Sequence, residues 1–218
     1  MYSTVHTENS SPVKLIVPSA EQLNKKDLSE YNDVEKMVSS MPYNALVPEL
    51  VNGRLFAKVM CHKINNLDPE NQKLKNELFT ELLGTFKNNI IETPFRCDYG
   101  SNIHLEEGVY MNYNCVFLDV SEVRIGKNTL LAPGVQVYTA GHPVDPIERR
   151  SSEFGKPISI GRDCWIGGNV IICPGITIGD GVTVGAGSVV TKNIESYCVV
   201  AGVPARVIKR LTPPKEDI

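Results

Sequence analysis

Residues 160–190 read IGRDCWIGGNVIICPGITIGDGVTVGAGSVV, and an aliphatic residue returns at every sixth position. These positions are Ile160, Ile166, Ile172, Ile178, Val184 and Val190, and a glycine directly follows four of them. A helical stripe repeats every 3.6 residues, a coiled coil every 3.5 and a half-buried strand every two, so none of these explains a period of six. The period instead predicts a three-sided solenoid, in which three short strands complete a coil of about 18 residues.

The same period continues upstream of this stretch. It passes through Cys97, Ile103, Val109 and Cys115, and again through Ile125, Leu131 and Val137. A coil of about 18 residues predicts that Cys97 and Cys115 are neighbours in adjacent coils. We expect them to pack in the core as thiols and not to form a disulfide.

The repeat fails once, over residues 139–157. This segment contains Gly141-His142-Pro143 and, further on, Glu153-Phe154. A regular solenoid does not need such a loop, and long loops in compact domains are often functional. The loop is therefore the first place to look for chemistry.

The rest of the chain divides by its hydrophobic pattern. Residues 1–33 are polar and predict a loose extension, whereas residues 34–89 carry apolar residues at helical spacing and predict a helical segment. The solenoid is expected over residues 90–210, with a short tail over residues 211–218.

Composition excludes several classes of protein. The 218 residues carry a net charge of -3, which gives no positive field for nucleic acid. The apolar runs are far shorter than the roughly 20 residues of a membrane-spanning helix. The polar N-terminus lacks the order of a secretory signal, and the six cysteines contain no Cys-x-x-Cys pair. We expect a cytoplasmic protein with free thiols and no metal site.

Several motifs occur in an order that resembles a known family. They are Glu35-Lys36-Met37 with Pro42-Tyr43-Asn44-Ala45, Phe95-Arg96-Cys97-Asp98-Tyr99-Gly100, Gly141-His142-Pro143, Asp163-Cys164-Trp165-Ile166-Gly167 and Ala201-Gly202-Val203-Pro204-Ala205-Arg206. Over about residues 34–210, the sequence is similar to the hexapeptide-repeat acetyltransferases of the maltose and galactoside O-acetyltransferase group. The resemblance implies a left-handed parallel β-helix preceded by a small helical segment. It also implies a homotrimer that transfers acetyl from acetyl-CoA to a sugar hydroxyl between adjacent subunits.

His142 is the candidate general base. A sugar hydroxyl must lose its proton as it attacks a thioester, and an imidazole is suited to accept it near neutral pH. His6 lies in the polar extension, His62 in the helical segment and His104 on a regular coil, whereas His142 lies in the loop and matches the catalytic histidine of the family.

The resemblance also implies binding residues. Asp98, Asn112 and Asp119 are expected to bind the acceptor hydroxyls, with Glu153 as a candidate partner of the imidazole and Tyr110 as a candidate contact to the sugar ring. For acetyl-CoA, the expected contacts are to the pantetheine arm at two small residues and to the phosphates at hydroxyl and cationic side chains: Gly168, Ala186, Thr191, Lys192, Arg206 and Lys209. Trp165 is a candidate contact to the cofactor or to a neighbouring subunit.

The sequence departs from the family pattern at one position, and two alternative functions remain. Galactoside-acetylating members carry an Asp after the aromatic residue of the helical segment, but Tyr43 is followed here by Asn44, so galactoside specificity does not follow. A zinc hydratase of the same fold needs three His ligands, and the solenoid offers only His104 and His142. A non-catalytic trimeric β-helix that serves as a binding or scaffold module is the other alternative. The physiological acceptor is not specified by these patterns.

Overall fold

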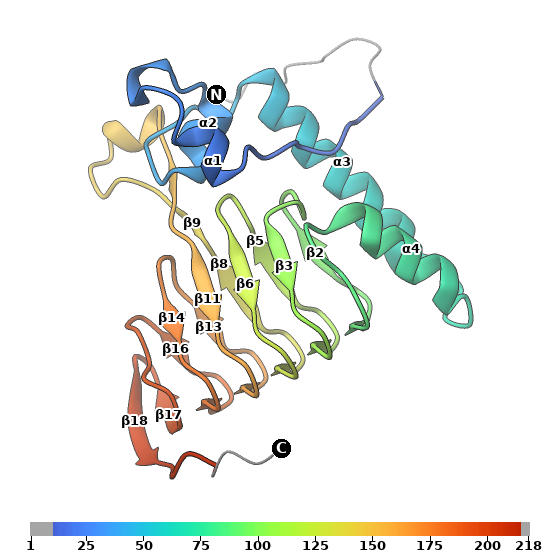
Figure 1. Ribbon diagram of the computed structural model, residues 1–218, viewed down its shortest axis with the longest axis vertical. Coiled ribbons are helices and arrows are strands. Elements are labelled where there is room, and N and C mark those ends of the chain that lie inside the picture. Colours follow the sequence, from blue (N-terminus) through green and yellow to red (C-terminus); the bar gives the residue numbers. More distant parts are fainter. Residues whose placement is uncertain (1–10, 215–218) are drawn as a thin grey trace.

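The structure is a computed structural model that describes residues 11–214. A parallel β-helix occupies the C-terminal part, and helices lie over its first coils (Figure 1). The predicted combination of a helical segment followed by a parallel β-helix is therefore confirmed. None of the helices within residues 11–214 is long and apolar enough to cross a bilayer.

The β-helix has three faces, and the chain visits them in the order 1, 2, 3. Face 1 contains β1 (Ile90–Ile91), β4 (Tyr110–Met111), β7 (Leu130–Leu131), β12 (Trp165–Ile166), β15 (Thr183–Val184), β17 (Cys198–Gly202) and β18 (Ala205–Arg210). Face 2 contains β2 (Arg96–Cys97), β5 (Val116–Leu118), β8 (Gln136–Tyr138), β13 (Ile171–Ile172) and β16 (Val189–Val190). Face 3 contains β3 (Ile103–Leu105), β6 (Val123–Ile125), β11 (Ile158–Ile160) and β14 (Thr177–Ile178).

The repeated aliphatic residues form the core. Every member of the series from Ile160 to Val190 is at most 1% exposed. Each strand pairs in parallel with the strand one coil away, so these side chains stack along the interior. Burial of this continuous column is the main source of stability for a solenoid.

The coils are not all the same length. Trp165 pairs with Thr183, which is a step of three hexapeptides along the chain. In the earlier coils, Tyr110 pairs with Leu130 and Arg96 with Val116, so each of these steps is longer by two residues. The extra residues lie in the corner between faces 2 and 3, which the chain crosses from β5 to β6.

This difference corrects the prediction for Cys97. Its partner in the next coil is Phe117 and not Cys115, because the two extra residues shift the register. The thiol of Cys97 lies 3.8 Å from that of Cys61. All six cysteines are free, and Cys115 is buried, as a core-packing thiol should be.

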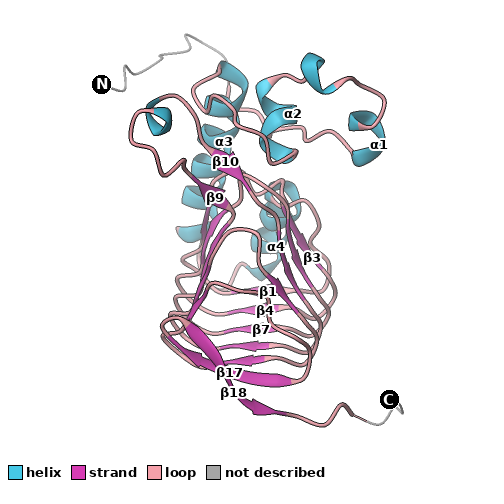
Figure 2. Ribbon diagram, turned by 90° about the vertical axis from the view of Figure 1, so that its left-hand side faces the viewer, coloured by secondary structure: helices cyan, strands magenta, loops and turns pink. Residues whose placement is uncertain are grey.

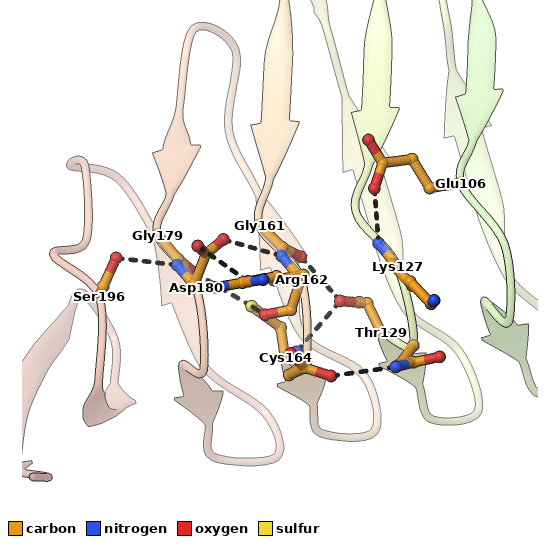
Figure 3. A network of polar contacts seen from close by, with 11 residues as sticks. Glu106, Lys127, Thr129, Gly161, Arg162, Cys164, Gly179, Asp180 and Ser196 are labelled. Carbon is orange, nitrogen blue, oxygen red and sulfur yellow. Dashed lines mark hydrogen bonds and ion pairs between the residues drawn. The ribbon is translucent and has the colours of Figure 1, made fainter. Parts of the chain in front are cut away.

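The corner between faces 3 and 1 shows how the coils are tied together (Figure 3). The carboxylate of Asp180 accepts a hydrogen bond from the backbone N–H of Arg162 at 2.9 Å, and the hydroxyl of Ser196 accepts one from the backbone N–H of Asp180 at 2.9 Å. Thr129 accepts from the N–H of Cys164 and donates to the carbonyl of Gly161. Side chains thus satisfy corner N–H groups that the short strands leave unpaired.

Other elements cover both ends of the β-helix. The helices are α1 (Ala20–Leu23), η1 (Leu28–Glu30), α2 (Asp33–Val38), α3 (Pro48–Asn65) and α4 (Gln72–Leu82). Phe79 of α4 packs edge-on against Phe95 of the first coil, and their ring centroids are 5.6 Å apart. At the other end, β18 pairs antiparallel with β17 and covers its free edge.

Residues 11–33 differ from the loose extension expected for residues 1–33. Leu15 and Tyr31 are buried, and the ammonium group of Lys14 donates to the carbonyls of Glu81 and Leu83 at the end of α4. Isolated apolar residues in a polar segment show no period, so the sequence pattern did not reveal this packing. Residues 1–10 and 215–218, including His6, lie outside the described residues.

Candidate active site

The loop predicted to carry chemistry leaves face 2 after β8. It rises toward α2 as a two-stranded ribbon of β9 (Ala140–Gly141) and β10 (Phe154–Gly155), with η2 (Glu148–Arg150) between them (Figure 2). A Cβ atom on Gly141 would lie 2.7 Å from the ring of Phe154. This close approach explains why glycine precedes His142.

The ribbon brings His142 and Glu153 together. His142 directly follows β9 and Glu153 directly precedes β10. The imidazole Nε2 lies 3.6 Å from Oε2 of Glu153, with the two side chains 51% and 20% exposed. His142 is therefore accessible to a substrate and has a carboxylate beside one of its ring nitrogens. Such a carboxylate can fix the orientation of the imidazole.

Two more carboxylates occupy the enlarged corner between faces 2 and 3. Asp98 follows β2, and its half-buried side chain makes no hydrogen bond to the described residues. Burial raises the pKa of Asp98 to about 6, an effect that the charge of Arg54 opposes and that of Glu153 strengthens. The interaction with Glu153 indicates that Asp98 faces the same region as the ribbon of β9 and β10 that carries His142, which we call the histidine ribbon.

The structure corrects the role expected for Asp119. Its side chain is 0% exposed, so it cannot bind acceptor hydroxyls at the surface. One carboxylate oxygen accepts hydrogen bonds from the backbone N–H groups of Asp98 and Tyr99, both at 2.9 Å. The other oxygen is buried with no partner in the part of the chain that the structure describes, and burial raises the pKa of Asp119 to about 8. Asp119 holds the turn that presents Asp98.

A pocket of about 350 Å³ opens next to Asp98, between α3 and face 2. Its lining includes the exposed cations Lys58 and Arg96 and residues of β5. The pocket is lined by Lys58, Cys61, His62, Asn65, Asn66, Arg96, Cys97, Asp98, Val116, Phe117 and Leu118. The helical spacing of apolar residues over residues 34–89 predicted a helical segment here but gave no sign that a helix forms one wall of a pocket.

The remaining predicted residues lie on other parts of the β-helix. Asn112 belongs to the corner between faces 1 and 2, where its side-chain oxygen accepts from the N–H of Tyr113 at 2.8 Å. Gly168 follows β12 and Ala186 follows β15, so both lie at the same corner in later coils. The two coils are adjacent, because the N–H of Gly167 donates to the carbonyl of Val184. The structure therefore separates these three residues from Asp98 and His142 by the width of face 2.

The predicted phosphate contacts lie toward the C-terminal end. Thr191 and Lys192 are exposed just after β16, and Arg206 and Lys209 are exposed on β18. In a single chain, the hydroxyl and cationic groups are thus at the opposite end of the β-helix from the pocket. Within residues 11–214, there is no group of three or more His, Cys, Asp and Glu side chains that could hold a metal ion.

Tyr43 is a contact of this site that the sequence did not predict. Its hydroxyl donates a hydrogen bond of 2.6 Å to Oε1 of Glu153, across 110 residues of sequence. Tyr43 belongs to a motif quoted above, but no periodicity connects it with the loop.

Comparison with known proteins agrees with this architecture. Residues 36–87 match the maltose acetyltransferase hexapeptide capping motif, and residues 157–192 match the hexapeptide repeat of succinyl-transferase. A maltose O-acetyltransferase from Clostridium difficile 630 superposes with a TM-score of 0.82 at 45% identity, over 84% of this chain and 98% of the other.

Two further relatives are also acetyltransferases. The galactoside O-acetyltransferase of Escherichia coli is 38% identical over 81% of this chain and 88% of its own. A hexapeptide-repeat acetyltransferase from Vibrio cholerae, solved with acetyl coenzyme A, has a TM-score of 0.75 at 32% identity, over 84% of this chain and 100% of the other. This chain belongs to the maltose and galactoside O-acetyltransferase family with hexapeptide repeats.

Proposed function

We propose that this chain transfers the acetyl group of acetyl-CoA to a hydroxyl of a sugar or similar small polyol, with His142 as the general base. The observation that carries the proposal is the accessible imidazole of His142 with Oε2 of Glu153 at 3.6 Å. The acyl donor is inferred from the relative solved with acetyl coenzyme A, and the acceptor class from the maltose and galactoside relatives.

The proposed reaction is a direct transfer in a ternary complex. The ring nitrogen that faces Glu153 keeps its proton, and the other nitrogen takes the proton of the acceptor hydroxyl as its oxygen bonds to the thioester carbonyl carbon. Backbone N–H groups stabilise the oxyanion. The carbon–sulfur bond then breaks, and the imidazolium returns the proton to the leaving thiolate.

Asp98 is the residue we propose for binding the acceptor. Its carboxylate is half-buried, has no hydrogen-bond partner among residues 11–214 and lines the pocket between α3 and face 2. A carboxylate of this kind can accept hydrogen bonds from two hydroxyls. Asp119 supports the turn by accepting a hydrogen bond from the backbone N–H of Asp98.

Acetyl-CoA is proposed to bind along the corner between faces 1 and 2. Small side chains at Gly168 and Ala186 leave the backbone open there, and a Cβ atom at Gly168 would come no closer than 3.3 Å to the carbonyl of Pro133. Asn112 lies at the same corner. We propose that the phosphates bind to the hydroxyl of Thr191 and to the cationic side chains of Lys192, Arg206 and Lys209.

A homotrimer would bring the two halves of the site together. The acceptor half and the corner between faces 1 and 2 are apart in one chain, so a neighbouring copy can complete the site. The outward side chains of face 1 include a column of exposed apolar groups, with Ile90 55%, Leu130 46% and Trp165 56% exposed. Contiguous apolar surface of this kind is typical of an interface. We propose that other copies of this chain cover it.

The test is a screen for release of the CoA thiol with monosaccharides, disaccharides, amino sugars and simple alcohols. With the best acceptor, His142→Ala should lower kcat by roughly 10² to 10⁴ while the Kd for acetyl-CoA stays unchanged. The control is His104→Gln, a half-buried histidine on face 3, which should keep the wild-type kcat. Near-normal turnover in His142→Ala would reject the mechanism, and absence of acetyl-CoA binding to the wild type would favour a non-catalytic scaffold.

A further inference from the structure

The histidine ribbon is held in place by the N-terminal segment. Tyr43 and Glu153 form an isolated antiparallel bridge, in which the N–H of Tyr43 donates to the carbonyl of Glu153 at 3.1 Å and the reverse bond is 3.4 Å. Tyr43 is 2% exposed and packs with Met37, Leu50 and Tyr99. The backbone of the loop is thus attached to a rigid apolar cluster just before β10.

The side chain of Tyr43 makes a second connection. Its hydroxyl donates to Oε1 of Glu153 at 2.6 Å, while Oε2 of the same carboxylate lies 3.6 Å from Nε2 of His142. One oxygen is therefore used to hold the carboxylate and the other faces the imidazole. Hydrogen bonds from a neutral donor to a carboxylate are short and comparatively strong, and this one fixes the torsion angles of a glutamate that would otherwise be mobile.

The phenol remains a donor throughout the working pH range. Burial raises the pKa of Tyr43 far above its ordinary value, and the negative charge of Glu153 acts in the same direction. Arg54, a cation that acts in the opposite direction, is itself engaged with the hydroxyl of Tyr99 at 2.6 Å and the carbonyl of Ala45 at 2.6 Å. The Tyr43 hydroxyl therefore keeps its proton and continues to donate to Glu153.

We propose that Tyr43 is a positioning residue for the transfer reaction, acting on His142 through Glu153. The inference rests on the proposed function of His142 and extends it: the N-terminal segment does more than cover the first coil, because it aligns the base. Misplacing a catalytic group by about 1 Å can cost on the order of 10²-fold in rate.

The test compares tyrosine hydroxyls in the same segment. Tyr43→Phe keeps the ring and the backbone bridge but removes the hydroxyl. Tyr31→Phe is the matched control, because Tyr31 is also buried and its hydroxyl donates to the carbonyl of Leu23 at 2.9 Å, away from the loop. We expect Tyr43→Phe to lower kcat by about 10- to 100-fold with the KM for acetyl-CoA unchanged, and Tyr31→Phe to leave kcat within twofold of the wild type.

A double-mutant cycle separates positioning from a merely structural role. If Tyr43 acts through Glu153, removing its hydroxyl in the Glu153→Gln background should change kcat by less than threefold, far less than in the wild type.

The outcomes separate this inference from the proposed function. The positioning role alone would be overturned if the losses of kcat in Tyr43→Phe and Glu153→Gln multiplied in the double variant. It would also be overturned by a kcat of Tyr43→Phe within twofold of the wild type while His142→Ala is inactive. A wild-type protein that releases no thiol with any acceptor would instead remove the proposed function. Circular dichroism of each variant establishes that the fold is kept.

Discussion

Replacing Asp119 by asparagine should change how the stability of the protein depends on pH. The folded protein buries this carboxyl completely, and burial raises its pKa to about 8. In the unfolded chain the pKa returns to its ordinary value, near 3.8. The folded state therefore favours the protonated acid. Its contribution to stability is complete below about pH 4 and is lost as the pH rises through about 8.

The size of the effect follows from these two values. The interval between 3.8 and about 8 corresponds to a loss on the order of 5 kcal/mol in the free energy of unfolding. For a chain of this length, this is up to about 10–20 °C in Tm. The asparagine side chain keeps an oxygen for the N–H groups of Asp98 and Tyr99 and cannot ionise. Its amide nitrogen takes the place of the unpaired oxygen and costs roughly 1–3 kcal/mol.

The assay is thermal unfolding of the full chain at pH 5, 6, 7 and 8, at constant ionic strength and protein concentration. The Tm of Asp119→Asn should lie near or below that of the wild type at pH 5 and above it at pH 8. Asp180→Asn is the control, because Asp180 also accepts a backbone N–H but its side chain is 41% exposed. A difference between Asp119→Asn and wild type that stays constant from pH 5 to pH 8 would refute the reasoning.

Three further variants test separate parts of the site. Asp98 has its pKa raised to about 6, so the KM for the acceptor should rise as the pH falls below 6, and steady-state kinetics should show no such rise in Asp98→Asn. Gly141→Ala places a Cβ atom 2.7 Å from the ring of Phe154 and should displace the ribbon, with a fall in kcat and a loss of about 1–3 kcal/mol in denaturant unfolding. Trp165→Glu puts a charge into the apolar column of face 1 and should yield monomers in light scattering; an unchanged mass would contradict the proposed interface.

The sequence predicted most of the fold because its period is a direct consequence of the geometry. One inward side chain per strand and one strand per face produce the six-residue series from Ile160 to Val190, and nothing else in the pattern competes with it. The loop at residues 139–157 was visible as the place where the period fails. The predicted pairing of Cys97 with Cys115 was wrong. The series upstream could be continued in steps of six through Val109 to Cys115, which is 18 residues on, but the paired strands there are 20 residues apart.

The candidate site was only partly predictable. His142 and Glu153 could be found because they lie in the interruption. The burial of Asp119 could not, since a carboxylate in a corner is expected to be exposed unless its backbone partners are known. Tyr43 was missed for a different reason: its contact with Glu153 spans 110 residues, and a pairing of that kind leaves no local trace in one sequence.

The longer coils coincide with the part of the β-helix that we propose binds the acceptor, and this has a physical explanation. A corner with six residues from one inward side chain to the next has room only for a tight turn. Two more residues between Phe117 and Ile125 allow Asp119 to fold inward and bind the N–H groups of the coil above, where Asp98 is presented. After the loop the coils shorten to three hexapeptides, and adjacent coils lie so close that a Cβ atom added to Gly167 would come within 2.6 Å of the nitrogen of Ala186. We propose that this corner of small residues binds the extended pantetheine arm. The change in coil length therefore divides the β-helix into a part that we propose binds the acceptor and a part that we propose binds the donor, with His142 emerging between them.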